Sequence, residues 1–118
     1  EDVFFTPIPI DSLVKITHEL LDLSVTGIVN VVGNERVSKK EFGLMIASYY
    51  NLPSDLIMPS KIKEHELKAN RPIDMSLSNL KLRKILGRDI VSLRDGLSII
   101  ENVQKKGRQM DLDGGVNK

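Results

Sequence analysis

One short stretch of the sequence, RPIDMSLS at residues 71–78, combines residue types that could bind a charged ligand. A residue that precedes proline avoids the α region, so we expect an extended backbone at Arg71 that holds its side chain in one direction. A planar guanidinium suits bidentate contact with a phosphate. The spacing is also compatible with an ion pair between Arg71 and Asp74 on the surface, which would contribute little to stability. On spacing alone the ion pair is the better-supported interpretation.

The sequence shows no other pattern typical of catalysis. It lacks a glycine-rich phosphate loop, a G-x-S-x-G elbow and an H-E-x-x-H motif. The two histidines, His18 and His65, are isolated and indicate surface positions, and without cysteine there is no thiolate metal site. Neither Tyr49 nor Tyr50 is followed by a lysine four residues later. We therefore predict no catalytic residue and no metal site in this chain.

The composition is that of an ordinary globular domain. The 118 residues carry 17 basic and 16 acidic side chains, so no overall field favours nucleic acid or an anionic membrane. The basic runs KLRK (81–84) and KKGR (105–108) lie late in predicted helices, where cations favour the helix dipole. No apolar run reaches membrane-spanning length and no secretory signal is visible. We expect a cytoplasmic protein, and the first residue, Glu1, suggests a piece of a longer one.

The best-defined elements lie between residues 27 and 50. The β-branched run Ile28–Val32 predicts a strand, ended at Gly33 by a turn with positive φ. Ser38 and Glu41 have the spacing of a capping box and predict the start of a helix. The apolar face of that helix consists of Phe42, Met45, Ile46 and Tyr49.

A second strand is predicted at Ile57–Pro59. Together with Ile28–Val32 and the intervening helix it would form a right-handed β-α-β unit with parallel strands. Before this unit, two prolines suggest that residues 3–10 form a short edge strand or a buried extended arm. Asp11 is the expected N-cap of a helix over residues 12–23. The fold class predicted is mixed α/β, with flanking helices.

The last third of the chain predicts two further helices. Ser78 is the expected cap of a short helix that ends at Gly87, and Ser92 the start of a helix over residues 93–106. Gly107 should end the second helix. We therefore divide the chain into a domain over residues 1–106 and a flexible tail over residues 107–118.

Four segments in order resemble the C-terminal part of extended short-chain dehydrogenase/reductases that act on nucleotide sugars. They are FTPIPIDSL, GIVNVVGNERVSKKEFGLMIA, RPIDMSLSNLKLRKILG and SLRDGL, and the similarity is greatest to the dTDP-4-dehydrorhamnose reductase branch. The resemblance spans about Phe5 to Ile100. It implies a small lobe that closes over the nucleotide sugar. NAD(P) and the catalytic Tyr-x-x-x-Lys pair would lie on an N-terminal Rossmann half that is absent here.

The resemblance also assigns roles to individual residues. The family arginine in the R-P/G-x-D/N stretch approaches the substrate pyrophosphate, and Arg71 matches it. Asp11, Gly33 and Ser38 match positions that shape the fold. Phe4-Phe5 stands where many epimerase-type relatives carry a basic residue, which favours the reductase branch over an epimerase or dehydratase lobe.

Two further expectations concern partners. One side of the lobe would rest on the missing Rossmann half, with the arm Val3–Ile10 and the loop Lys61–Arg71 as walls of the interface, so the isolated chain should expose an apolar patch. We expect it to be marginally stable alone or to self-associate. The alternative function, also compatible with the missing catalytic pair, is a non-catalytic regulatory or interaction module of the same fold.

Overall fold

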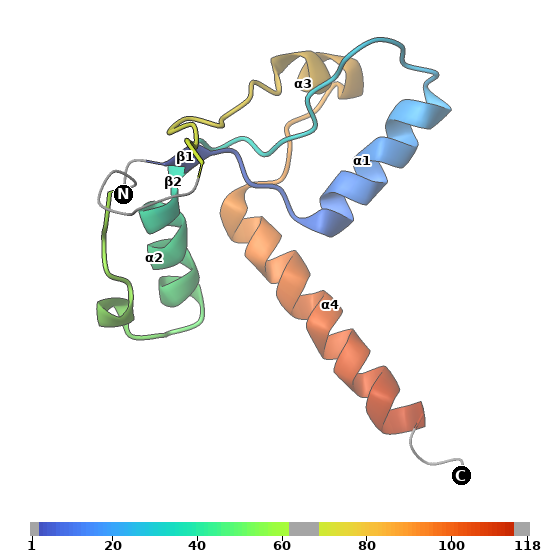
Figure 1. Cartoon of the computed structure of the whole chain (residues 1–118). Helices are drawn as coiled ribbons and strands as arrows, with labels where there is room; N and C mark the ends of the chain where they lie inside the picture. The colour runs from blue at the N-terminus through green and yellow to red at the C-terminus, as the bar shows by residue number, and fades with distance from the viewer. Residues whose placement is uncertain (1–2, 62–68, 115–118) are drawn as a thin grey trace.

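The protein has a mixed α/β fold, as the sequence predicts, and its sheet is very small (Figure 1). The computed structural model describes residues 3–61 and 69–114, with side chains up to residue 106. The elements are, in chain order, β1 (Phe4–Phe5), α1 (Ile10–Asp22), β2 (Val37–Ser38), α2 (Lys39–Tyr49), a 3-10 turn η1 (Ser54–Leu56), α3 (Leu80–Leu86) and α4 (Leu93–Gly114).

The sheet joins three segments that are far apart in the sequence. β1 pairs antiparallel with β2, with Phe4 opposite Ser38. On its other side Phe4 bridges in parallel to Asp74. The Phe4 amide donates to the Ile73 carbonyl at 2.8 Å and the Met75 amide donates to the Phe4 carbonyl at 2.9 Å. β1 is therefore central and not an edge strand. β1 can be central because Pro7 and Pro9, which have no amide hydrogen to donate, come after its paired residues.

The predicted β-α-β unit is wrong. Neither Ile28–Val32 nor Ile57–Pro59 forms a strand, and the two strands that the described residues contain are antiparallel. Side chains of other segments bond to the first run instead: Lys81 Nζ donates to the Ile28 carbonyl at 2.7 Å. Val29 and Val31 pack against the core. The β-branched run thus packs half-buried side chains against the core without a neighbouring strand.

Gly33 does not adopt the positive φ expected of it; the described residues with positive φ are Ser24, Gly27, Asn51 and Gly87. A Cβ atom at Gly33 would lie 2.0 Å from the Pro7 carbonyl oxygen. Glycine is therefore required because another part of the backbone passes directly against it.

The predicted caps have different outcomes. The box of Ser38 and Glu41 is confirmed, with the Glu41 amide donating to Ser38 Oγ at 3.1 Å and the Ser38 amide donating to Glu41 Oε2 at 2.7 Å. Asp11 is not an N-cap, because α1 already begins at Ile10 with Pro9 in the cap position. Asp11 lies in the first turn instead, where a carboxylate favours the helix dipole.

α3 begins one residue later than predicted. Asn79 occupies the N-cap position, and its buried amide is engaged elsewhere, donating to the Gly33 carbonyl at 3.0 Å. Ser78 is not the N-cap, although its hydroxyl accepts from the Leu80 amide at 3.3 Å. The helix ends at Gly87 in the left-handed conformation (φ 65°), as predicted.

The predicted end of the last helix at Gly107 is wrong, because α4 continues to Gly114. One glycine costs a helix interior about 1 kcal/mol relative to alanine, which need not end a long helix. Residues 107–114 are therefore helical, and the flexibility predicted for the tail stays a prediction. None of the helices in the described ranges is both long and apolar enough to cross a membrane.

The core is small for a chain of this length. Ile16 of α1, Leu82 of α3 and Ile90 form its buried cluster. Apart from this cluster, Phe5 packs edge-on against Phe42 of α2, with ring centroids 5.5 Å apart. The Cα radius of gyration is 17.9 Å, against about 13 Å for a compact domain of similar size. The shape is therefore extended, and α4 projects from the rest (Figure 1).

Large apolar side chains remain exposed along α1 and beyond it. Ile10 is 68% exposed, Leu21 69% and Ile28 87%. Exposed apolar surface of this kind is what the sequence leads us to expect of a chain that rests on a partner or associates with itself.

Replacing Ser38 with alanine should lower the free energy of unfolding by about 1 kcal/mol, because the Glu41 amide loses its acceptor at the start of α2. Urea unfolding monitored by circular dichroism measures the change. Ser48→Ala, an exposed position later in the same helix, is the matched control. Equal stability of the Ser38 variant and the wild type would contradict the cap's role.

The isolated chain should self-associate as its concentration rises, because several large apolar side chains of α1, such as Leu21, are exposed. Sedimentation velocity over a concentration series measures this. Leu21→Lys should reduce the association, whereas Thr26→Lys adds the same charge at an exposed polar residue and should not. A stable monomer at every concentration would show that the exposed side chains do not drive association.

Candidate functional site

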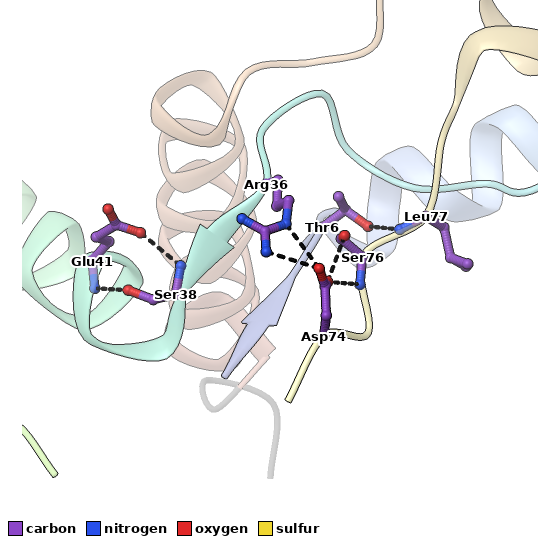
Figure 2. A network of polar contacts seen from close by, with 7 residues as sticks. All are labelled: Thr6, Arg36, Ser38, Glu41, Asp74, Ser76 and Leu77. Atoms are coloured by element: carbon purple, nitrogen blue, oxygen red, sulfur yellow. Dashed lines mark hydrogen bonds and ion pairs between the residues drawn. The ribbon is translucent and has the colours of Figure 1, made fainter. Parts of the chain in front are cut away.

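The RPIDMSLS stretch is held to the rest of the molecule by three sets of contacts. The first is the backbone pairing of Ile73 and Met75 with Phe4. The second is an ion pair between Asp74 and Arg36, whose Nη2 atom lies 2.8 Å from Asp74 Oδ2 (Figure 2). The third is the Leu77 amide, which donates to the Thr6 hydroxyl at 3.2 Å. The stretch is thus held at Phe4 of β1, at Arg36 and at Thr6, which follows β1.

Asp74 uses both carboxylate oxygens. Oδ2 accepts from Nε and Nη2 of Arg36, at 3.2 and 2.8 Å. Oδ1 accepts from the amide and the hydroxyl of Ser76, at 3.0 and 2.6 Å. The Arg36 guanidinium, followed by the two Ser76 donors, holds the pKa of the Asp74 carboxyl well below its ordinary value of 3.8. Asp74 therefore carries its charge throughout the physiological range.

Arg36 also lies over an aromatic ring. Its Cζ atom is 3.8 Å from the centroid of the Phe4 ring, a cation–π distance. Phe4 thus contacts Arg36 with its ring and segment 73–75 with its backbone. The Phe4 ring and the Asp74 carboxylate together orient the guanidinium.

Arg71 is exposed, and no hydrogen bond or ion pair joins it to another residue among 3–61 and 69–114. The ion pair with Asp74 that the spacing suggests is wrong, because Asp74 is paired with Arg36. The carboxylate closest in sequence to Arg71 is thereby neutralised by a different cation. The positive charge of Arg71 remains available to a ligand, two residues before the segment that pairs with β1.

The other titratable candidates form no site in the described part of the chain. No cluster of three metal-ligating side chains occurs there. His18 is exposed on α1, and His65 lies outside the described residues, as does most of the loop Lys61–Arg71. Tyr49 donates from its hydroxyl to Glu101 Oε2 at 3.0 Å and so links α2 to α4. That contact gives Tyr49 a structural role.

Arg36 is a site residue that the sequence pattern did not predict. Its partner Asp74 is 38 residues away, and nothing in the local sequence of either residue signals the pairing. Arg36 and Asp74 are charged residues, which are common on any surface. The sequence did not reveal which segments pair with the short strands beside them. Only knowledge that β2 and segment 73–75 flank the same strand would have brought them together.

Comparisons with known proteins give no relative. No protein-family model, no curated protein and no solved structure matches this chain significantly. The resemblance to nucleotide-sugar reductases therefore rests on the four sequence segments alone.

Replacing Arg36 with glutamine should raise the pKa of Asp74 toward its ordinary value of 3.8, because the guanidinium is the largest cause of the shift. A pH titration followed by carboxyl ¹³C NMR measures it. Arg88→Gln removes a cation that pairs with Glu19 and should leave Asp74 unchanged. An unaltered Asp74 titration in the Arg36 variant would contradict the pairing.

The same pair should make stability depend on pH in one direction. The pKa of Asp74 is lower in the folded than in the unfolded state, so its contribution is present above pH 3.8 and is lost as the pH falls below that value. The wild type should therefore be more stable than Arg36→Gln at neutral pH, and the two should converge in strong acid.

Proposed function

We propose that this chain is the substrate-binding part of an NAD(P)-dependent nucleotide-sugar reductase similar to dTDP-4-dehydrorhamnose reductases, and that it carries no catalytic residue of its own. One observation supports this most: Arg71, the residue that matches the family's pyrophosphate-binding arginine, is exposed and not neutralised by Asp74.

The chemistry follows from the guanidinium. A diphosphate linking a nucleoside to a sugar carries two negative charges, and an arginine can bind it through two parallel hydrogen bonds. An arginine already paired with a neighbouring carboxylate would have to break that pair first. The Arg36–Asp74 pair removes this cost from Arg71. Anchoring of residues 73–77 on β1 further reduces the flexibility that ligand binding would have to overcome.

The proposal divides the reaction between two parts of a larger protein. The cofactor and the hydride-transfer residues would lie on a Rossmann half, and this chain would orient the sugar nucleotide and exclude water at the interface. The exposed apolar side chains of α1 would supply part of the surface that meets the other half. A cytoplasmic location is part of the same proposal.

Arg71→Gln should weaken binding of dTDP-glucose to the chain about tenfold, the loss expected for one charge-assisted contact to phosphate. A ¹H–¹⁵N NMR titration measures the dissociation constant and should show shifts at residues 69–78. Lys84→Gln removes the same charge from an exposed position on α3 and serves as the control.

Equal affinity of wild type and Arg71→Gln would remove Arg71 from the proposal. If glucose alone bound as tightly as dTDP-glucose, the diphosphate would not contribute to binding, and a nucleotide sugar would no longer be the proposed ligand. The sequence that precedes Glu1 in the gene separates the two functions: a glycine-rich fingerprint with Tyr-x-x-x-Lys argues for an enzyme, and a fingerprint without that pair argues for a regulatory module.

A further inference from the structure

The Arg36 side chain is held in place and is still half exposed. Its Cζ atom lies 3.8 Å from the centroid of the Phe4 ring. Asp74 Oδ2 accepts from its Nε atom at 3.2 Å and from Nη2 at 2.8 Å (Figure 2). The side chain nevertheless remains 47% exposed. Because the ring covers one face of the planar guanidinium and Asp74 takes one edge, the exposed part includes the opposite face and the Nη1 end.

Two other arginines form comparable ion pairs and show what is particular to Arg36. Arg83 pairs with Asp89 and Arg88 pairs with Glu19, each at 2.6 Å. The side chains of these two arginines are 45% and 46% exposed, almost the same as that of Arg36. In the described part of the chain, Arg36 is the arginine of such a pair that also lies over an aromatic ring. Its plane is therefore oriented by two partners of different kinds.

A guanidinium fixed in this way is suited to stacking. Nucleobases stack on the planes of arginine side chains as they do on aromatic rings, and the contact tolerates any base because every base has a π face. Since Asp74 already neutralises the charge of Arg36, the contact would come mainly from the two planar groups and not from net charge. Little side-chain freedom would be lost on binding, because Phe4 and Asp74 already restrict the guanidinium.

We propose that the exposed face of the Arg36 guanidinium binds the base of a nucleoside diphosphate, so that the base, the guanidinium and the Phe4 ring form three stacked layers. The inference rests on the proposed function, in which Arg71 binds the diphosphate. Arg71 is three residues from Asp74, which holds Arg36, and an extended chain of that length spans at most about 11 Å. Because the base and the phosphates lie at opposite ends of a nucleotide, one molecule can contact both arginines.

The test compares dTDP with methyl diphosphate, which carries the same charged groups and no base. Each is titrated into the ¹⁵N-labelled 118-residue chain and followed by NMR. The Nε proton of Arg36 is bonded to Asp74, which slows its exchange with water and keeps its signal visible. On addition of dTDP this proton should shift upfield, because it then lies over the ring of the base. Methyl diphosphate should cause no such shift.

Variants separate the contact to the base from the contact to the phosphates. Arg36→Lys keeps the charge but lacks the plane, so it should weaken binding of dTDP about two- to fivefold and leave binding of methyl diphosphate unchanged. Arg71→Gln should weaken binding of both ligands. Arg88→Lys, made in a pair of similar exposure, should change neither. Unchanged amide shifts of Phe4 and Met75 in the ligand-free Arg36→Lys chain would confirm that the sheet is intact.

If Arg71→Gln weakens both ligands but Arg36→Lys leaves dTDP binding unchanged, or weakens both ligands equally, this inference is overturned and the proposed function stands. The same holds if dTDP binds the wild-type chain without an upfield shift of the Arg36 Nε proton. That measurement needs no variant, so poor folding of Arg36→Lys would not prevent the decision. If Arg71→Gln changes neither affinity, the proposed role of Arg71 is contradicted instead, and if neither ligand binds, both proposals fail.

Discussion

The structure depends on the backbone pairing of a single strand, β1, on both of its edges. Phe4 bonds to β2 on one side and to residues 73–75 on the other, so three segments spread over more than half of the chain are joined at one residue. The ring of Phe4 also supports the Arg36 guanidinium. Because α2 begins directly after β2, the junction sets how α2 lies relative to the RPIDMSLS stretch.

That junction also decides which cation Asp74 neutralises. Arg36 lies just before β2, and Asp74 lies in the parallel bridge to Phe4. These two places, on either side of β1, bring the two side chains together as an ion pair. Had β1 been an edge strand, Asp74 would have been available to Arg71. The proposed binding of a diphosphate depends on Arg71 not being neutralised by Asp74. That is a consequence of strand pairing and not of the local sequence.

The sequence predicted the features that local interactions determine. The capping box of Ser38 and Glu41 and the glycine that ends α3 depend on residues within one helical turn of each other, and both were confirmed. The start of α4 at Leu93 was also correct. In each case the donor, the acceptor and the backbone conformation are encoded in a few adjacent residues.

The features that failed depend on distant parts of the chain. Ile28–Val32 has strand composition, but a strand also needs a partner with free amides and carbonyls. The side chains of Lys81 and Asn79 donate to carbonyls of this run instead. Gly33 is required by the passing Pro7 carbonyl and not by a turn. The Arg36–Asp74 pair follows from the sheet. Nothing within a few residues of these positions carries that information.

Hydrogen exchange at the amides of Phe4, Lys39 and Met75 tests the junction most directly, because these three amides bond across the segments that it joins. The structure predicts that all three exchange much more slowly than in an unfolded chain, and that they exchange together. Exchange of the Phe4 and Met75 amides at unfolded-chain rates, while the amides of α2 stay protected, would show that residues 73–75 are not held on β1.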